Sequence, residues 1–230
     1  MTRTRAGPDA ARRIPRPADN CPMSPKRSSG TRGPSGSRRR AELLAIAADL
    51  FARRGFQATT VRDIADAAGI LSGSLYHHFD SKETMVDEIL RDFLDSQRRA
   101  QERVLADSGD ARDRIAGLVR QSFRTVHRHR AAVVILQNES NHLATSDRFA
   151  YLRAAAGDFE RTWTRVLQEG QRAGVLRADL NVKLAYRFIR DAVWTSVHWY
   201  NPRGRLTLTA VAEQYVTILC DGIAVAETKR

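Results

Sequence analysis

Hydroxyl groups and aromatic rings that suit phosphate oxygens and base edges gather in one short segment: Ser72, Ser74, Tyr76 and His77. Leu75 and Phe79 are four residues apart, so they fall on one face of a helix. We therefore expect a helix of about two turns over Ser72–His78, with this apolar face packed against a core and the polar side chains facing a partner. Such a surface suits the binding of a nucleic acid.

The preceding residues predict a second helix and a tight turn that position this segment. The Thr60 hydroxyl can accept a hydrogen bond from an unpaired backbone N–H one turn later, and Asp63 stands at the acidic third position. An apolar face follows at helical spacing: Val61, Ile64, Ala65 and Ala68. Gly69 stands where a left-handed turn residue is needed, since it has no Cβ to clash. Two short helices joined in this way form a helix-turn-helix, whose second helix enters the major groove of DNA.

The longer string resembles the DNA-binding signature of the TetR family of one-component transcriptional repressors. The matching residues are the capped helix, Ala68-Gly69, the run GSLYHHF over 73–79 and Ser81-Lys82-Glu83. The resemblance implies a homodimer in which each Ser72–His78 helix enters a major groove of a palindromic double-stranded DNA operator. The DNA contacts expected from it are Arg38, Arg39, Thr60, Ser72, Gly73, Ser74, Tyr76, His77 and Lys82.

One residue departs from the family pattern. Leu71 stands where the family usually has a capping serine. Two explanations stay open: Ser72 caps the helix instead, or the start of the helix depends on packing of Leu71.

Composition limits the class of protein. The chain has 230 residues, of which 42% are hydrophobic, enough for a small domain and a medium helical domain. The two cysteines, Cys21 and Cys220, lie far apart and fit two free thiols in a reducing cytosol, so we expect a cytoplasmic protein. No apolar run reaches the roughly 18 residues of a membrane span, and the basic N-terminus lacks the apolar part of a secretory signal.

The positive charge is concentrated at one end of the chain. The net charge is +12, but residues 1–40 hold eleven Lys and Arg against two Asp, so the rest of the chain is nearly balanced. DNA binding is therefore indicated by the motif and not by the overall charge.

Three regions follow from the pattern along the chain. Residues 1–36 are rich in Arg, Pro, Gly and Ser, which predicts a disordered basic extension, and both Met1 and Met23 suit initiation. Residues 37–82 are expected to form the helix-turn-helix domain, and residues 83–230 a ligand-binding and dimerisation domain.

The expected fold class is all-α, with about nine helices and no strand alternation. Outside the helix-turn-helix, the expected helices cover roughly 37–54, 81–107, 110–128, 130–144, 147–173, 181–200 and 207–226. For the helix over 81–107, the expected cap is Asp80 with Glu83 as its reciprocal partner. The apolar stripes of the last two suit either the dimer interface that the resemblance implies or the core of a monomer.

A repressor of this type needs a small-molecule effector that favours the conformation unable to hold DNA. Aromatic and guanidinium side chains that suit a ligand with an apolar and an anionic part are Arg161, Trp163, Arg165, Arg187, Arg190 and Trp194. Residues 58–90 and 186–207 are also similar to the actinobacterial TetR-type repressors of cholesterol and ketosteroid breakdown, which implies a coenzyme A thioester as effector. No cofactor and no metal are expected.

Other classes of function fit less well. Adjacent His77 and His78 point about 100° apart on a helix, a poor metal pair, and Glu139 with His142 lacks a third ligand or a nucleophile, so we expect no enzyme. A non-specific nucleoid binder leaves the large C-terminal region unexplained. A repressor of an efflux or drug-response operon with a hydrophobic ligand remains the alternative.

Overall fold

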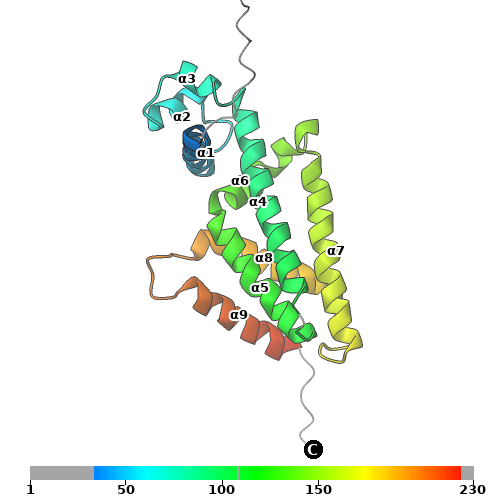
Figure 1. The fold of residues 1–230 in the computed structure, drawn as a ribbon. Helices are drawn as coiled ribbons and strands as arrows, with labels where there is room; N and C mark the ends of the chain where they lie inside the picture. The colour runs from blue at the N-terminus through cyan, green and yellow to red at the C-terminus, as the bar shows by residue number, and fades with distance from the viewer. Residues whose placement is uncertain (1–33, 108, 224–230) are drawn as a thin grey trace, which may run out of the picture.

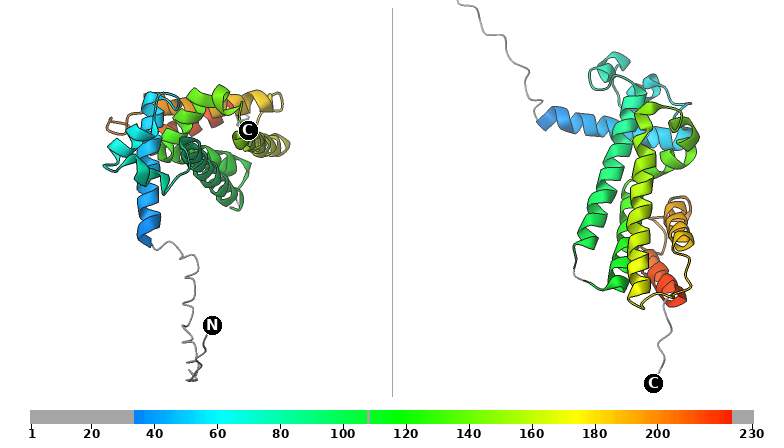
Figure 2. Two further views of the ribbon diagram at one scale, coloured as in Figure 1. Left: turned by 90° about the horizontal axis from the view of Figure 1, so that it is seen from above. Right: turned by 90° about the vertical axis from the view of Figure 1, so that its right-hand side faces the viewer.

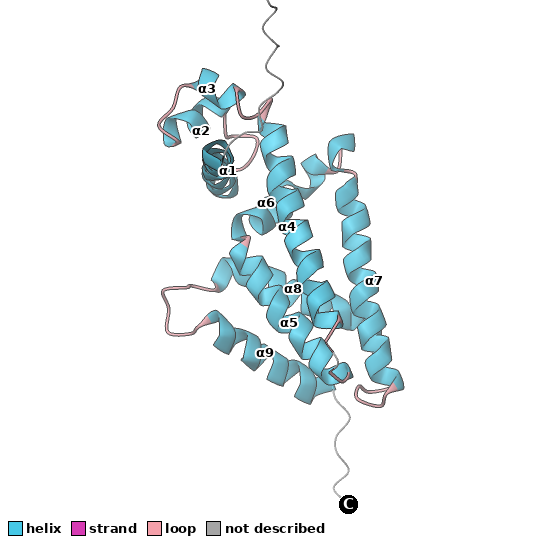
Figure 3. Cartoon of the chain, in the orientation of Figure 1, coloured by secondary structure: helices cyan, strands magenta, loops and turns pink. Residues whose placement is uncertain are grey.

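The computed structural model describes residues 34–107 and 109–223, and within these ranges the regular structure is helical (Figure 3). The nine α-helices of these residues are α1 (Pro34–Arg54), α2 (Val61–Ala67), α3 (Ser72–Tyr76), α4 (Lys82–Leu105), α5 (Ala111–Arg128), α6 (Arg130–Leu143), α7 (Tyr151–Arg172), α8 (Val182–Trp199) and α9 (Leu208–Ile223). The predicted all-α class is therefore confirmed for this part of the chain.

The helices form a head and a body (Figure 1). The head consists of α1, α2 and α3, and α1 runs roughly perpendicular to the long helix α4, against which it packs (Figure 2). In the body, α5 packs against α4, α6, α7, α8 and α9, and it is the most enclosed helix. The head joins the body along α4 and through contacts between α1 and α6.

One hydrophobic core runs through both parts. The apolar stripe of α1 places Leu43, Ala47 and Phe51 in the core of the head. Along α4, Met85 and Phe93 are both buried, although they lie two turns apart. Because a helix is stiff over this length, α4 carries the head and the body on one continuous packed stripe.

Several helix ends differ from the sequence-based expectation. Helix α1 begins at Pro34, three residues early, because proline has no backbone N–H to leave unpaired in a first turn. Helix α4 is capped by Ser81, whose hydroxyl accepts from Thr84 N–H, so the expected cap at Asp80 lies one residue too early. Asn181 caps α8 by accepting from the backbone of Leu184.

The expected helix over 147–173 is also interrupted. A 3₁₀ turn, Asp147–Phe149, buries Phe149 before α7 starts at Tyr151. The expected disorder of residues 1–36 is wrong for residues 34–36, which form the start of α1. The rest of that range, and the expected extension of the last helix from residue 224 to 226, lie outside the described residues.

Candidate nucleic-acid interface and ligand cavities

Helix α2 starts with a reciprocal cap. Asp63 N–H donates to the Thr60 hydroxyl (3.1 Å), and Thr60 N–H donates to the Asp63 carboxylate (2.8 Å). The Thr60 hydroxyl also donates to that carboxylate (2.5 Å), and these bonds from Thr60 hold the pKa of Asp63 below its usual value. The predicted capping residue is therefore confirmed, and its hydroxyl is engaged within its own turn.

The turn between α2 and α3 is fixed by backbone geometry. Gly69 has a φ of +65°, the left-handed conformation that was expected of it. Ile70 N–H donates to the Ala65 carbonyl (3.0 Å), and the Arg39 guanidinium donates to the Ala68 carbonyl (3.2 Å) from α1. Arg39, an expected DNA contact, thus also ties α1 to this turn.

Helix α3 starts without a side-chain cap, and neither explanation offered for its start holds. Leu71 occupies the cap position with no side-chain hydrogen bond, and Ser72 is the first residue inside the helix. Leu71 is also 79% exposed, so packing does not hold it. The helix starts through its backbone, where Ser74 N–H donates to the Leu71 carbonyl (2.9 Å).

Two of the four polar residues expected on the outer face of this helix are exposed, and α3 ends at Tyr76, two residues before the expected end at His78. Leu75 and Phe79 are buried, whereas Tyr76 is 55% exposed and His77 is exposed. A Cβ built on Gly73 would meet no atom within 4 Å, so this part of the helix is open to a close approach. Ser72 and Ser74 are half-buried beside it.

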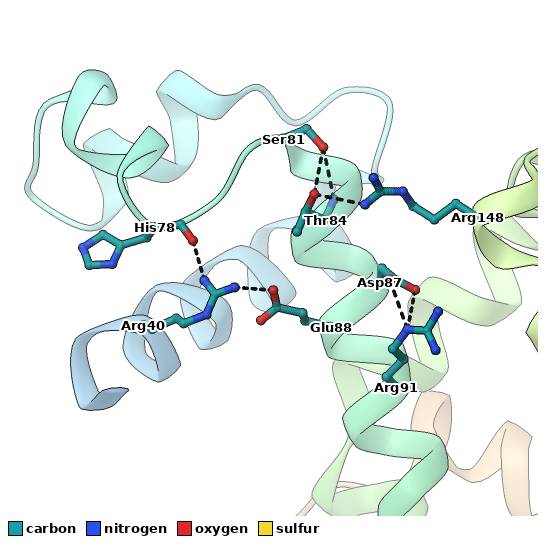
Figure 4. A network of polar contacts seen from close by, with 8 residues as sticks. All are labelled: Arg40, His78, Ser81, Thr84, Asp87, Glu88, Arg91 and Arg148. Carbon is teal, nitrogen blue, oxygen red and sulfur yellow. Dashed lines mark hydrogen bonds and ion pairs between the residues drawn. The ribbon is translucent and has the colours of Figure 1, made fainter. Parts of the chain in front are cut away.

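Arg40 joins α1 to the junction of α3 and α4 (Figure 4). Its guanidinium donates to the His78 carbonyl (2.5 Å), pairs with Glu88 of α4 and lies 4.0 Å from the ring centre of Phe79. Arg38, by contrast, pairs with Glu42 of its own helix (3.3 Å), and its side chain is 85% exposed. Of the three arginines, Arg38 is therefore the freest to contact a phosphate.

Lys82 holds the loop between α1 and α2. Its ammonium donates to the carbonyls of Phe56 (3.0 Å), Thr59 (3.3 Å) and Gln57 (3.5 Å), and it lies 4.3 Å from the Phe56 ring centre. The three N–H donors of the Lys82 ammonium match these three carbonyl acceptors. Lys82 therefore has a structural role in addition to the DNA contact that the sequence predicts for it.

The C-terminal half of α6 contacts the same loop from the other side. The Glu139 carboxylate accepts from Phe56 N–H (2.9 Å), and Gln57 Nε2 lies 2.7 Å from His142 Nε2. The ring centres of Phe56 and His142 are 5.6 Å apart. Glu139 and His142 thus connect the body to the head, and the described residues hold no group of His, Cys, Asp or Glu that could bind a metal ion.

A second set of polar contacts joins α4 to the start of α7 (Figure 4). Arg148 donates to the hydroxyl of Thr84 (3.0 Å), which lies in the first turn of α4. One turn further on, Arg91 pairs with Asp87 (3.0 Å) and lies over the ring of Tyr151 (4.0 Å to its centre). These bonds hold the α7 end of the body against the part of α4 next to the head.

The inner cavity lies inside the body and has a volume of about 750 Å³. Its apolar walls come from α4, α6, α7 and α8: Leu94, Leu136, Leu152, Phe159, Trp163, Ile189, Val193 and Trp194. Arg190 also lines it, paired with Asp191 (2.8 Å). Three of the predicted ligand residues, Trp163, Arg190 and Trp194, are thus brought together here.

The outer cavity, about 880 Å³, lies between α4 and α7. The charged residues that line it are Arg91, Arg98, Arg161, Arg165, Asp95, Glu102 and Asp158. Arg161 pairs with Asp158, whereas Arg165 has no carboxylate partner among the described residues. The two cavities adjoin, because Leu94 and Phe159 line both. Arg187 is exposed on α8 and lines neither cavity.

Two glutamines of α4 are candidate ligand groups that the sequence analysis missed. Gln97 lines the inner cavity and Gln101 the outer one, and they are 6% and 7% exposed. Gln97 Oε1 and Gln101 Nε2 have no hydrogen-bond partner. An unpaired buried amide atom is costly, so each favours a ligand with the complementary group. Their i, i+4 spacing on an otherwise apolar stripe was the signal in the sequence.

The small residues 154–157 also contribute to both cavities. Ala154 and Ala155 line the outer cavity, and Ala156 and Gly157 line the inner one. Larger side chains in this turn of α7 would reduce both volumes.

We predict that Lys82→Met, which keeps the aliphatic stem, lowers the free energy of unfolding by about 1–3 kcal/mol, because three carbonyls lose a charged donor. DNA affinity should fall with it. Urea unfolding followed by circular dichroism checks the first effect, with Arg62→Met as the control, since Arg62 makes only an exposed pair on α2. Unchanged stability with weakened DNA binding would instead assign Lys82 to phosphate contact alone.

Comparison with known proteins agrees with this geometry. Residues 43–89 match the family described as bacterial regulatory proteins, tetR family, and residues 108–223 match the tetracyclin repressor-like C-terminal domain. The chain is 50% identical over 202 residues to the HTH-type transcriptional repressor KstR2 of Rhodococcus jostii, covering 88% of this chain and 98% of that protein. None of the described helices has the length and apolar character needed to cross a membrane.

Solved structures show the same fold. The ketosteroid transcriptional regulator KstR2 of Mycobacterium tuberculosis superposes with a TM-score of 0.79 at 49% identity, covering 81% of this chain and 95% of that chain. AibR, solved in complex with isovaleryl coenzyme A and operator DNA, has a TM-score of 0.69 at 24% identity, covering 78% and 97%; this likeness concerns the fold alone. The chain therefore belongs to the TetR family of bacterial regulatory proteins, and it is a DNA-binding transcriptional repressor rather than an enzyme.

Proposed function

We propose that this repressor acts as a homodimer on a palindromic operator, controls genes of steroid catabolism and is released by a coenzyme A thioester with an apolar ring-bearing acyl group. The observation that carries the effector is the pair of adjoining cavities, one apolar and one rich in arginine. The steroid assignment is supported by the similarity to the KstR2 repressors, which are about half identical over most of the chain.

The head has the surface that major-groove binding needs. Helix α3 exposes Tyr76 and His77 beside an open Gly73, while Leu75 anchors it to the core. A phenol and two serine hydroxyls can contact phosphates, which position the head, and base edges, which specify the sequence.

The homodimer is supported by the exposed apolar surface of the last two helices. One face of α8 is buried, as at Ile189 and Val193, but other apolar side chains lie outside the core: Phe188 of α8 is 66% exposed and Ile218 of α9 is 62% exposed. A chain whose last helices only completed a monomer core would bury these side chains too, so a second copy is the occupant that we infer.

The two cavities together fit the two ends of an acyl coenzyme A. The inner cavity has a size typical of small-molecule sites, and its tryptophans and aliphatic walls suit a fused-ring acyl group. In the outer cavity, Arg165 is free of carboxylates among the described residues, and Gln101 offers an unpaired N–H. Guanidinium and amide donors suit phosphate oxygens. The nucleotide end therefore belongs in the outer cavity.

Helix α6 provides a path from the inner cavity to the head. Leu136 and Ser140 line the cavity, and Glu139 and His142, on the same two turns, contact the loop between α1 and α2. A ligand that binds better to one position of α6 than to another shifts the population of head positions by that difference in affinity.

The alternative, a drug-responsive repressor, is favoured by one feature of the inner cavity. Glu160 lines it together with Trp163 and Trp194, a combination that suits a hydrophobic cation. The effector experiment below includes such a ligand.

We expect Tyr76→Ala to abolish operator binding and to leave the helicity and the dimer intact, because Tyr76 is exposed and contributes little to the core. Fluorescence anisotropy with an operator duplex, selected from a random pool by the protein itself, measures the affinity, and sedimentation checks the dimer. Retained binding would exclude the docking of α3 in the major groove.

We expect the thioester of coenzyme A with a two-ring steroid remnant to release the labelled operator saturably, and free coenzyme A and the hydrophobic cation tetraphenylphosphonium to leave it bound. Arg165→Gln should raise the thioester concentration needed by about tenfold, because a charge-assisted hydrogen bond is lost. Arg187→Gln is the matched control, since Arg187 lines neither cavity. Release by the cation alone would favour the drug-responsive alternative.

We expect Glu139→Ala to keep thioester binding, measured by calorimetry, but to reduce the factor by which the thioester weakens operator binding, because the α6 contact with Phe56 N–H is lost. Glu139→Gln keeps an acceptor oxygen and should behave like the natural chain. Full release of operator from the alanine variant would place the coupling elsewhere.

A further inference from the structure

Large apolar side chains are exposed on only two surfaces of the described chain. Two of them, Leu71 and Tyr76, lie at the two ends of α3. The others lie on α8, α9 and the connection between them: Leu184, Phe188, Trp199, Leu206 and Ile218. Single exposed apolar residues are ordinary, but this separation onto two candidate interfaces is not random scatter. The second group marks the proposed dimer contact. We therefore ask which partner the first group, and Leu71 in particular, contacts.

Leu71 serves no purpose in the fold of the head. It stands at the cap position of α3, where its side chain makes no hydrogen bond, and it is the most exposed of these side chains at 79%. A serine at this position could accept a backbone N–H of the first turn, and leucine gives up that bond. The neighbouring Ile70, by contrast, packs against the core.

The backbone that carries Leu71 is nevertheless firmly held. Before it, Ile70 N–H donates to the Ala65 carbonyl (3.0 Å), and after it, Ser74 N–H donates to the Leu71 carbonyl (2.9 Å). Leu75, one turn later, is buried. Because this backbone is already ordered, only the side-chain rotamers of Leu71 lose freedom when it meets a partner, which favours a specific contact.

The chemistry of the major groove identifies the partner. Base edges there present hydrogen-bond donors and acceptors, which an aliphatic side chain cannot use, and one apolar group, the C5-methyl of thymine. Ser72 and Ser74, beside Leu71, carry the hydroxyls that can bond polar atoms.

We propose that Leu71 is a specificity-determining residue that contacts a thymine methyl group at one position of each operator half-site. The proposal rests on the docking of α3 in the major groove. In this proposal, Leu71 replaces the capping serine that is usual in the family because an apolar side chain at this position reads a base, and the helix cap is lost in return.

The test compares the sequences that variants choose. Duplexes are selected from a random pool by the natural chain, by Leu71→Ala and by Leu71→Met, each as the full-length protein. We expect the natural chain and the methionine variant to require thymine at one position of each half-site, and the alanine variant to accept other bases there while keeping the rest of the motif. Arg172→Ala truncates an exposed side chain at the end of α7, outside the head, both cavities and the proposed dimer contact, and should keep the thymine requirement.

Direct binding then measures the methyl group itself. Replacing that thymine by deoxyuracil removes only the methyl, and we expect this to weaken binding of the natural chain roughly fourfold per half-site, the value of one buried methyl group, and binding of Leu71→Ala not at all. An alanine variant that keeps the thymine requirement, or equal losses for both proteins, would overturn the proposal. Failure of the natural chain to select any motif would overturn the docking as well, so the two failures can be told apart.

Discussion

The arrangement of this protein depends on α4 being packed in two places at once. Its first turns are buried against the head, with Met85 fully covered, and two turns later Phe93 is fully covered by the body. A single helix cannot shift at one end without disturbing the packing at the other, because protein interiors have few voids to absorb the movement. The position of the head therefore depends on how the body packs.

Polar contacts refine this coupling where the core ends. The loop between α1 and α2 is held between Lys82 of α4 and Glu139 of α6. Arg40 of α1 also pairs with Glu88 of α4. Each bond alone is worth little, since it replaces bonds to water. Together they hold the head against α4 and α6, two of the helices that also wall the inner cavity.

The surface of the described chain divides its tasks among separate regions. Apolar side chains are exposed at α3 and along α8 and α9, whereas the cavities open between α4 and α7 and inside the body. Most of the net positive charge belongs to residues 1–40, whereas α3 contains no Lys or Arg and exposes the phenol of Tyr76.

Local chemistry was readable from the sequence alone. The capping box of Thr60 and Asp63, the left-handed Gly69 and the helical class all follow from residues within one or two turns of each other, where hydrogen bonds and periodicity leave few alternatives. The family was readable for the same reason, because its signature lies in this compact stretch.

Only the tertiary structure decided which distant residues meet. Lys82 bonds carbonyls more than twenty residues away, Trp163 and Trp194 share a cavity that Arg187 does not reach, and the buried amides of Gln97 and Gln101 became visible only once their neighbours were in place. A side chain's partner depends on how helices cross, and helix crossing is settled by the packing of the whole core rather than by any short pattern.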